Sequence, residues 1–268
     1  MPVLHHTTLG ESGPRVVFCH GLFGQGKNWT TIAKALADSY RVTLVDMPNH
    51  GRSAWTEHLD LVQAADQVAE LLDAAEPVAL VGHSMGGKIA MLLALRHPHL
   101  VERLVIVDIA PVDYPSGSEF AGYISGMQAL DLGALSTRAQ ADEALIPSVP
   151  HPTVRSFLLQ NLRRDGDSWR WQPNLQLLGD ELHQVTGWPT AALEGVEPYP
   201  GPTLWVGGAR SAYVVDEYAG VMQHWFPRVR RVTVKEAGHW VHSEQPEIFI
   251  GILRRFLDSP ATQGPAPA

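Results

Sequence analysis

The sequence has a single cysteine, Cys19, among its 268 residues. One cysteine cannot form an intrachain disulfide, so no covalent cross-link of this kind supports the fold. Cys19 follows the apolar run Val16, Val17 and Phe18, and a free cysteine in such a run usually packs as a small hydrophobic side chain. We therefore expect a buried, inert thiol at this position.

Positive charge and long apolar runs are also scarce. Lysine and arginine total 20 against 28 acidic residues, a net charge of −8, and no basic run could follow a phosphate backbone, which argues against nucleic acid as a partner. No stretch reaches the roughly 18 apolar residues of a membrane span, and Met1 to Thr8 lack the basic and apolar parts of a signal peptide. We expect a soluble, cytoplasmic protein with no membrane partner; the sequence favours no particular oligomeric state.

Six short aliphatic or β-branched runs alternate with longer helical patterns. Continuous apolar runs are typical of strands buried on both faces, as in a parallel sheet. Apolar residues at helical spacing over 61–72 join the second and third runs into a βαβ unit, and further helices are expected at about 86–97 and 216–226. The pattern predicts a doubly wound α/β fold. The six predicted strands are 16–18, 42–45, 78–81, 104–107, 204–206 and 232–234.

One segment interrupts this alternation. Residues 115–202 carry many prolines and tryptophans, several helical patterns and no clear strand, which predicts an inserted helical cap. A chain of this length lies near the upper limit for one hydrophobic core, so we expect one core, residues 1–114 and 203–258, with an insertion. Residues 259–268 are rich in proline and small residues and are predicted to form a flexible tail.

The third predicted strand leads directly into Gly82-His83-Ser84-Met85-Gly86, followed by a predicted helix. A serine on a tight strand-to-helix turn leaves little room two residues away on either side, which explains the glycines of G-x-S-x-G. The helix directs its N-terminal amides and positive dipole end toward the serine oxygen. We therefore predict that Ser84 is a nucleophile, and we call this strand-to-helix turn the nucleophile elbow.

A serine nucleophile needs a base, which in such sites comes late in the chain. The last predicted strand is followed by Ala237-Gly238-His239, so we predict that His239 is this base. The chain has 13 histidines, and the position and preceding glycine of His239 favour it over His242. His83, next to the serine, is expected to point away into supporting packing.

Acyl transfer also needs hydrogen-bond donors for the developing oxyanion. We assign this role to the backbone amides of Met85, directly after the serine, and Leu22, in the loop that follows the first predicted strand. That loop, His20-Gly21-Leu22-Phe23-Gly24, precedes a helix expected near Trp29. The segment 49–53 is expected to brace the loop through hydrogen bonds.

Five motifs together resemble the bacterial YbfF-like esterases and their mitochondrial α/β-hydrolase relatives. The resemblance extends from about residue 15 to 257 and is looser through the predicted cap. It implies an α/β-hydrolase fold and hydrolysis of short or medium acyl esters, or of acyl thioesters, without a cofactor. The motifs that carry it are His20–Gly24, Asp46–Ser53, Gly82–Lys88, Val107–Tyr114 and Gly238–His242.

The third member of the predicted triad departs from the common α/β-hydrolase pattern G-G-x-x-D. After the predicted strand 204–206 this chain reads Gly207-Gly208-Ala209-Arg210-Ser211-Ala212, with alanine in place of the acid. Asp108, at the end of the strand beside the elbow strand, could reach the far nitrogen of His239 and fix its tautomer. The resemblance places the acid there as well. Asp216 is the competing candidate, but it lies at a predicted helix start. Asp113 and Asp46 are expected to be structural.

Three aromatic residues, Phe23, Trp29 and Trp240, are candidates to line an acyl pocket, although aromatic residues at such positions often form plain core. No cluster of cysteine, histidine and aspartate has metal-ligand spacing, and the elbow lacks the ending of a phosphate-binding loop, so neither a metal nor a nucleotide cofactor is expected.

Three function classes remain open. The first is a carboxylic-ester hydrolase or thioesterase, acting on a small-molecule acyl ester. The second uses the same triad as a perhydrolase, lactonase or carbon–carbon bond hydrolase. The third is a non-catalytic sensor that binds a small molecule. An intact set of Ser84, His239 and Asp108 favours an enzyme, because a sensor has less need of all three.

Overall fold

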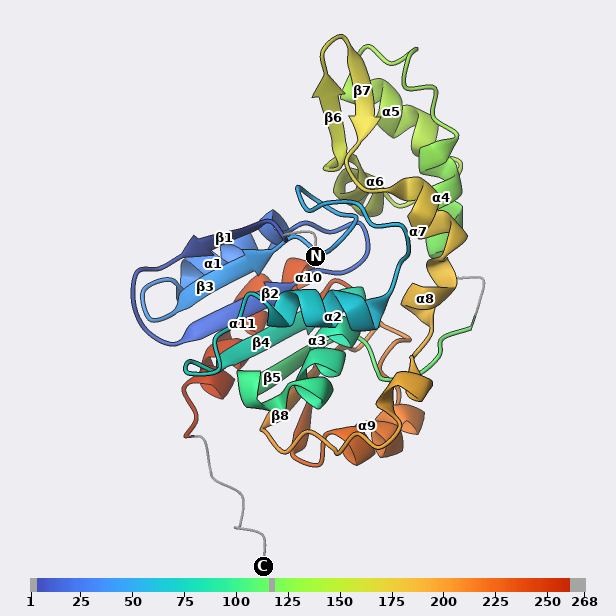
Figure 1. The fold of residues 1–268 in the computed structure, drawn as a ribbon. Helices are drawn as coiled ribbons and strands as arrows, with labels where there is room; N and C mark the ends of the chain where they lie inside the picture. Colours follow the sequence, from blue (N-terminus) through green and yellow to red (C-terminus); the bar gives the residue numbers. More distant parts are fainter. Residues whose placement is uncertain (1–3, 116–118, 261–268) are drawn as a thin grey trace, which may run out of the picture.

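The computed structural model describes residues 4–115 and 119–260, and a twisted seven-stranded sheet forms its centre (Figure 1). The strand order is β1-β3-β2-β4-β5-β8-β9; β1 runs antiparallel to β3, and the other neighbours are parallel. The α/β-hydrolase architecture with a mostly parallel sheet is thus as predicted. The strands are β1 His6–Leu9, β2 Arg15–Cys19, β3 Arg41–Val45, β4 Val78–His83, β5 Val101–Val107, β8 Thr203–Gly208 and β9 Val229–Val234.

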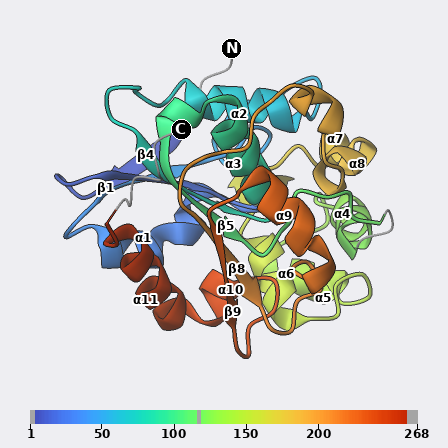
Figure 2. The same ribbon diagram turned by 90° about the horizontal axis from the view of Figure 1, so that it is seen from below.

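Helices cover both faces of the sheet, as Figure 2 shows in the view from below. One face packs against α1 (Thr30–Leu36) and α11 (Pro246–Leu257), and the other against α2 (Leu61–Ala69), α3 (Met85–Arg96) and α9 (Ala219–Trp225). The short helices of the core are η1 Gly26–Trp29, η2 Pro98–Leu100, η4 Asp216–Tyr218 and α10 Val241–Glu244.

All six predicted core strands are present, whereas β1 was not predicted. Its sequence, His-Thr-Thr-Leu, is polar and largely exposed, because β1 lies at the edge of the sheet and pairs only with β3. A search for continuous apolar runs detects strands buried on both faces and passes over such an edge strand. Central β2 is the opposite case: Val16, Val17, Phe18 and Cys19 are each 0% exposed, and burial raises the pKa of the Cys19 thiol to about 12.

The elements between β5 and β8 gather beside the sheet in Figure 1, and we call residues 119–202 the cap segment. It was expected to contain several helices and no clear strand; the helices are present, and the hairpin β6–β7 is a correction. Both strands have four residues and carry arginines on exposed positions, so they lack the apolar run used to find strands. Its elements are α4 Glu119–Gln128, α5 Arg138–Leu145, α6 Pro152–Leu159, β6 Leu162–Asp165, β7 Ser168–Trp171, α7 Leu175–Asp180, α8 Leu182–Thr186 and η3 Thr190–Leu193.

Both ends of the chain lie partly outside the described residues. The predicted tail, residues 259–268, lies outside the described residues except for Ser259 and Pro260. Among the helices within 4–115 and 119–260, none combines the length and apolar character needed to cross a membrane.

Candidate active site

Ser84 occupies a sharp turn between β4 and α3. Its φ of 52° and ψ of −121° are unfavourable for a residue with a side chain, and such strain gathers at functional sites. A Cβ atom at Gly82 would lie 2.2 Å from the Gly86 carbonyl oxygen, and one at Gly86 would lie 2.4 Å from the carbonyl oxygens of Cys19 and His20. Both glycines of the motif are therefore required by close backbone approach.

Ser84, His239 and Asp108 form a continuous chain of hydrogen bonds. Ser84 Oγ lies 3.0 Å from His239 Nε2, and His239 Nδ1 lies 2.8 Å from Asp108 Oδ2. Because a carboxylate only accepts, Nδ1 carries the proton and Nε2 is free to accept from the serine hydroxyl. The three residues are 4%, 8% and 0% exposed, so little water competes for these contacts. The structure brings His239, and not His242, to the serine.

The Asp108 carboxylate is held by two further donors. Asp108 follows β5 with a φ of 52°; its Oδ1 accepts from the Gly208 amide at 2.8 Å, and its Oδ2 accepts from the Ser211 hydroxyl. Ser211 was not predicted from the sequence. Its only signal was its place in the loop after Gly207-Gly208, where the common pattern would supply an acid.

The competing carboxylates have other partners. Asp216 is 98% exposed and forms an ion pair with Arg231 at 2.6 Å. Asp113 accepts from the Trp188 amide at 2.5 Å, and Asp46 accepts from the amides of Gly26 and Arg52. These contacts match the structural roles expected for Asp113 and Asp46.

Two buried histidines support His239 from behind. His83 Nε2 donates to the His239 carbonyl oxygen at 2.8 Å, and burial, together with His239 and His242, holds the pKa of His83 well below its usual value. His242 stacks on Trp29 with ring centroids 4.1 Å apart, and burial, with a smaller contribution from His239, lowers its pKa to about 3. Both rings are therefore neutral near pH 7, and both are packing residues.

The loop after β2 passes directly against the serine, since a Cβ at Gly21 would lie 3.0 Å from Ser84 Cβ. Within residues 4–115 and 119–260, the amides of Leu22 and Met85 donate to no protein acceptor, which leaves both available to a substrate oxygen. Segment 49–53 braces the loop as expected, because the Phe23 amide donates to His50 Nε2 at 3.2 Å. Burial lowers the pKa of His50 to about 3, so this nitrogen stays an acceptor.

Comparison with known proteins identifies the family. The family described as "alpha/beta hydrolase fold" matches residues 14–246. The chain belongs to this family. It is 39% identical over 266 residues to the mouse sn-1-specific diacylglycerol lipase ABHD11, covering 96% of this chain and 85% of that protein. It is 31% identical over 245 residues to the Escherichia coli esterase YbfF, covering 91% and 92%.

A solved structure, "Marine microorganism esterase", superposes with a TM-score of 0.91 at 32% identity, covering 96% of this chain and all of that one. The resemblance inferred from the five motifs is therefore confirmed. The protein is an α/β hydrolase of the esterase or lipase type.

Two open cavities lie beside Ser84 and His239, and they share lining residues. The smaller, about 510 Å³, is bordered by Ser84 and Met85 and by mostly apolar or aromatic side chains. The larger, about 850 Å³, is bordered by His239 and by a polar rim that includes Lys27 and Arg210. Tyr213, whose ring lies 4.3 Å from that of His239, borders both cavities.

Of the three aromatic residues predicted to line the pocket, Trp240 borders the larger cavity. The prediction that Phe23 and Trp29 line the pocket is corrected: their side chains are buried, with 1% and 0% exposure, and border neither of the two cavities. Trp29 is packed between core rings and borders only a hollow of about 20 Å³ behind the loop, and Phe23 packs toward Phe120 of the cap segment. Their proximity to the loop in sequence did not reveal which way the rings turn.

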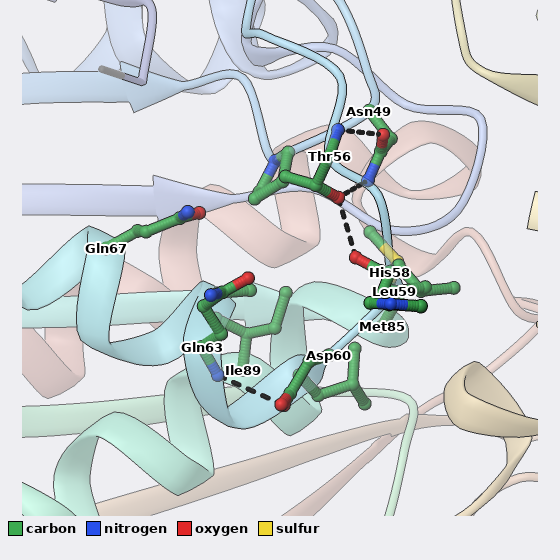
Figure 3. A pocket seen from close by; sticks show the side chains of 12 residues that line it. Asn49, Thr56, His58, Leu59, Asp60, Gln63, Gln67, Met85 and Ile89 are labelled. Atoms are coloured by element: carbon green, nitrogen blue, oxygen red, sulfur yellow. Dashed lines mark hydrogen bonds between the residues drawn. The ribbon is translucent and has the colours of Figure 1, made fainter. Parts of the chain in front are cut away.

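A separate small pocket lies between the loop after β3, helix α2 and the start of α3 (Figure 3). Its volume of about 10 Å³ is too small for an organic substrate. Asn49 and Thr56 exchange two hydrogen bonds at its edge, of 2.8 and 2.9 Å, which order this loop next to Met85. The residues around this pocket therefore help to hold the turn that carries Ser84 and Met85.

Lys88, four residues after Ser84, is fully buried in α3. Its Nζ lies 2.6 to 3.1 Å from four carbonyl oxygens, which share its three N–H donors: those of Val112, Val185, Thr186 and Gly187. These carbonyls lie in the chain that follows β5 and at the end of α8 in the cap segment. Burial lowers the pKa of Lys88 to about 7.

Among the described residues, no cluster of three or more histidine, cysteine or acidic side chains is arranged to hold a metal ion.

Proposed function

We propose that this hydrolase is a serine carboxylic-ester hydrolase that cleaves short- to medium-chain acyl esters through an acyl-enzyme on Ser84. The observation that carries the proposal is the buried chain from Ser84 Oγ through His239 to Asp108, with contacts of 3.0 and 2.8 Å. Nucleophile, base and orienting acid stand in the order that acyl transfer needs.

In the first half of the reaction, Ser84 Oγ attacks the ester carbonyl carbon while His239 Nε2 takes the hydroxyl proton. The carbonyl oxygen becomes an oxyanion, which the amides of Leu22 and Met85 stabilise by hydrogen bonds. The intermediate then collapses, the bond to the alcohol oxygen breaks, and His239 gives its proton to the departing alcohol.

In the second half, His239 takes a proton from a water molecule that attacks the acyl-enzyme. The bond to Ser84 Oγ breaks, the serine regains its proton from His239, and a carboxylic acid is released. Asp108 keeps the imidazole in the tautomer with Nδ1 protonated and stabilises the imidazolium formed in both halves.

The two cavities suggest where each part of the ester binds. The smaller one begins at Ser84 and Met85 and is walled by Ile109, Phe120 and Tyr213, which suits an apolar acyl chain. The larger one begins at His239, which protonates the leaving group, and its rim carries charged and polar groups. We infer that the acyl chain occupies the smaller cavity and the alcohol the larger.

A turnover screen tests this function. The substrates are p-nitrophenyl esters of graded acyl length, the matching acyl-CoA thioesters and a diacylglycerol, the last because the mouse relative is named as a diacylglycerol lipase. We expect highest kcat/KM for short- to medium-chain esters and covalent labelling by a fluorophosphonate. Absence of both turnover and labelling in the folded protein would overturn the proposal.

A further inference from the structure

The loop that carries Leu22 is held partly by a residue far away in the sequence. Asn161 lies between α6 and β6 of the cap segment and is 0% exposed. Its Nδ2 donates to the Phe23 carbonyl oxygen at 2.7 Å, and its Oδ1 accepts from Gln25 Nε2 at 2.6 Å. A buried amide bonded at both ends is costly to disturb, because removing either partner leaves a desolvated polar group unpaired.

The backbone of Asn161 is fixed as well. Its amide donates to the Leu158 carbonyl oxygen at 3.0 Å, and its carbonyl oxygen accepts from the Gln172 amide at 3.0 Å. The side chain therefore projects from a rigid point at which α6 and the β6–β7 hairpin meet. Gln25 is held in turn, since its Nε2 also donates to the Gln160 carbonyl oxygen at 3.3 Å.

Phe23 is a residue that needs such support. Its φ of 61° lies in the left-handed region, which is unfavourable for a bulky side chain. Its amide donates to His50 from the core, and its carbonyl oxygen accepts from Asn161 of the cap segment. These two contacts fix the peptide groups on both sides of Phe23, and the residue before it, Leu22, supplies a proposed oxyanion donor.

We propose that Asn161 is a positioning residue for the oxyanion hole: by holding Phe23 in its left-handed conformation, it sets the direction of the Leu22 amide. The inference rests on the proposed function. It makes the cap segment part of the reaction centre, in addition to its role as a wall of the cavities.

This arrangement has a specific kinetic signature. The hydrogen bonds of Asn161 go to the loop and to its own segment, whereas those of the triad side chains go to core residues, so loss of Asn161 leaves the triad intact. Removal of a whole oxyanion donor costs about 10² to 10³ in kcat, and a misdirected donor costs less. We expect kcat to fall about 10- to 100-fold with KM within about twofold.

The test compares Asn161→Ala and Asn161→Asp with the parent protein. Asn161→Asp keeps the size and the acceptor for Gln25 but removes the donor to Phe23. It therefore tests the inference even if Asn161→Ala does not fold. The matched control is Trp55→Phe, which removes another hydrogen bond between core and cap segment, from Trp55 Nε1 to the Gln172 carbonyl oxygen, and leaves Phe23 untouched.

The second readout is the affinity of a trifluoromethyl ketone, whose tetrahedral adduct places an oxyanion in the hole. We expect its affinity to fall by the same factor as kcat/KM in both Asn161 variants, and the pH dependence of kcat/KM to stay as in the parent. Trp55→Phe is expected to change neither quantity.

Two results would overturn the inference: a kcat that is unchanged in the Asn161 variants, whether or not KM rises, or equal losses in Trp55→Phe. An inactive, unlabelled parent protein would instead contradict the proposed function.

Discussion

The proposed triad of this hydrolase and the loop that carries Leu22, a proposed oxyanion donor, are supported in different ways. Ser84, Asp108 and His239 follow the carboxyl ends of core strands, and within the described residues their side-chain hydrogen bonds go to other core residues. The loop carrying Leu22 is held both by His50 of the core and by Asn161, which lies 138 positions after Phe23. A displaced cap segment would therefore disturb the oxyanion hole before it disturbed the triad.

The largest effect is expected on the triad side, from Ser84→Ala. Without the hydroxyl no acyl-enzyme can form, so we expect turnover to fall by a factor on the order of 10⁶ and labelling by a fluorophosphonate to disappear. Circular dichroism and steady-state kinetics on the same preparation measure this. A Ser84→Ala protein that still carried the label would show that another residue is the nucleophile.

Asp108→Asn is expected to lower turnover by a factor on the order of 10⁴, because an amide favours the wrong tautomer of His239. Asp216→Asn is the matched control, and it is expected to keep most activity, since Asp216 is an exposed partner of Arg231. Measured kcat/KM for the two variants decides between the carboxylates. The reverse order of losses would mean that the acid had been assigned wrongly.

On the oxyanion side, His50→Ala is expected to lower kcat by about 10- to 100-fold, because the Phe23 amide loses its acceptor. His50 and Asn161 hold the same residue, so their effects are expected to be non-additive in a double-mutant cycle. The Asp108 and Asn161 substitutions, in contrast, are expected to multiply. Additive losses for His50 and Asn161 would show that the loop is not held as one unit.

Ser211→Ala tests the finer support of the triad. Asp108 keeps the Gly208 amide and His239 as partners, so the loss of one hydrogen bond is expected to cost about 1 kcal/mol, or roughly fivefold in kcat. Because Ser211 acts through Asp108, the same substitution in an Asp108→Asn background is expected to have little further effect. A full fivefold loss in that background would assign Ser211 a separate role.

The smallest effect near neutral pH concerns stability. His50 and His242 have pKa values lowered to about 3 in the folded state, against 6.5 in the unfolded chain. Between pH 3 and 6.5 the unfolded chain binds more protons than the folded protein does. The free energy of unfolding therefore has its full value above pH 6.5 and decreases as the pH falls toward 3. The slope is about 1.4 kcal/mol per histidine per pH unit below 6.

Urea denaturation at pH 7.5, 6.5 and 5.5 measures this slope. His242→Phe keeps an aromatic ring against Trp29 but removes a titrating group, so we expect a slope smaller by one proton. An unchanged slope in this variant would mean that His242 accepts a proton without loss of the fold.

The sequence alone was sufficient for the features that depend on local pattern. The six buried strands follow from apolar runs, and Ser84 and His239 follow from short motifs next to those strands. Asp108 could be found because few carboxylates lie at the end of a core strand, from which they could reach His239. The contact observed between Asp108 and His239 is the one this reasoning requires.

Features that depend on long-range contacts could not be predicted in this way. Nothing in the local sequence distinguishes Asn161 from other asparagines, because its partners lie 136 and 138 positions away. Lys88 looked like a continuation of the elbow motif, and only the fold shows the four carbonyl groups around it. β1 has no buried residue, and the four-residue strands β6 and β7 have one each, Leu162 and Trp171, so none of the three shows a continuous apolar run.

Cys19 supplies an internal reporter for the whole sheet. It is the last residue of β2, an interior strand between β3 and β4, and is 0% exposed; its thiol pKa of about 12 leaves almost no thiolate in the folded state. An alkylating reagent can therefore react only when the sheet opens, and the alkylation rate under native conditions measures the population of open molecules. Each molecule whose sheet opens can thus be alkylated once, at Cys19, and mass spectrometry detects it by the mass of one added alkyl group.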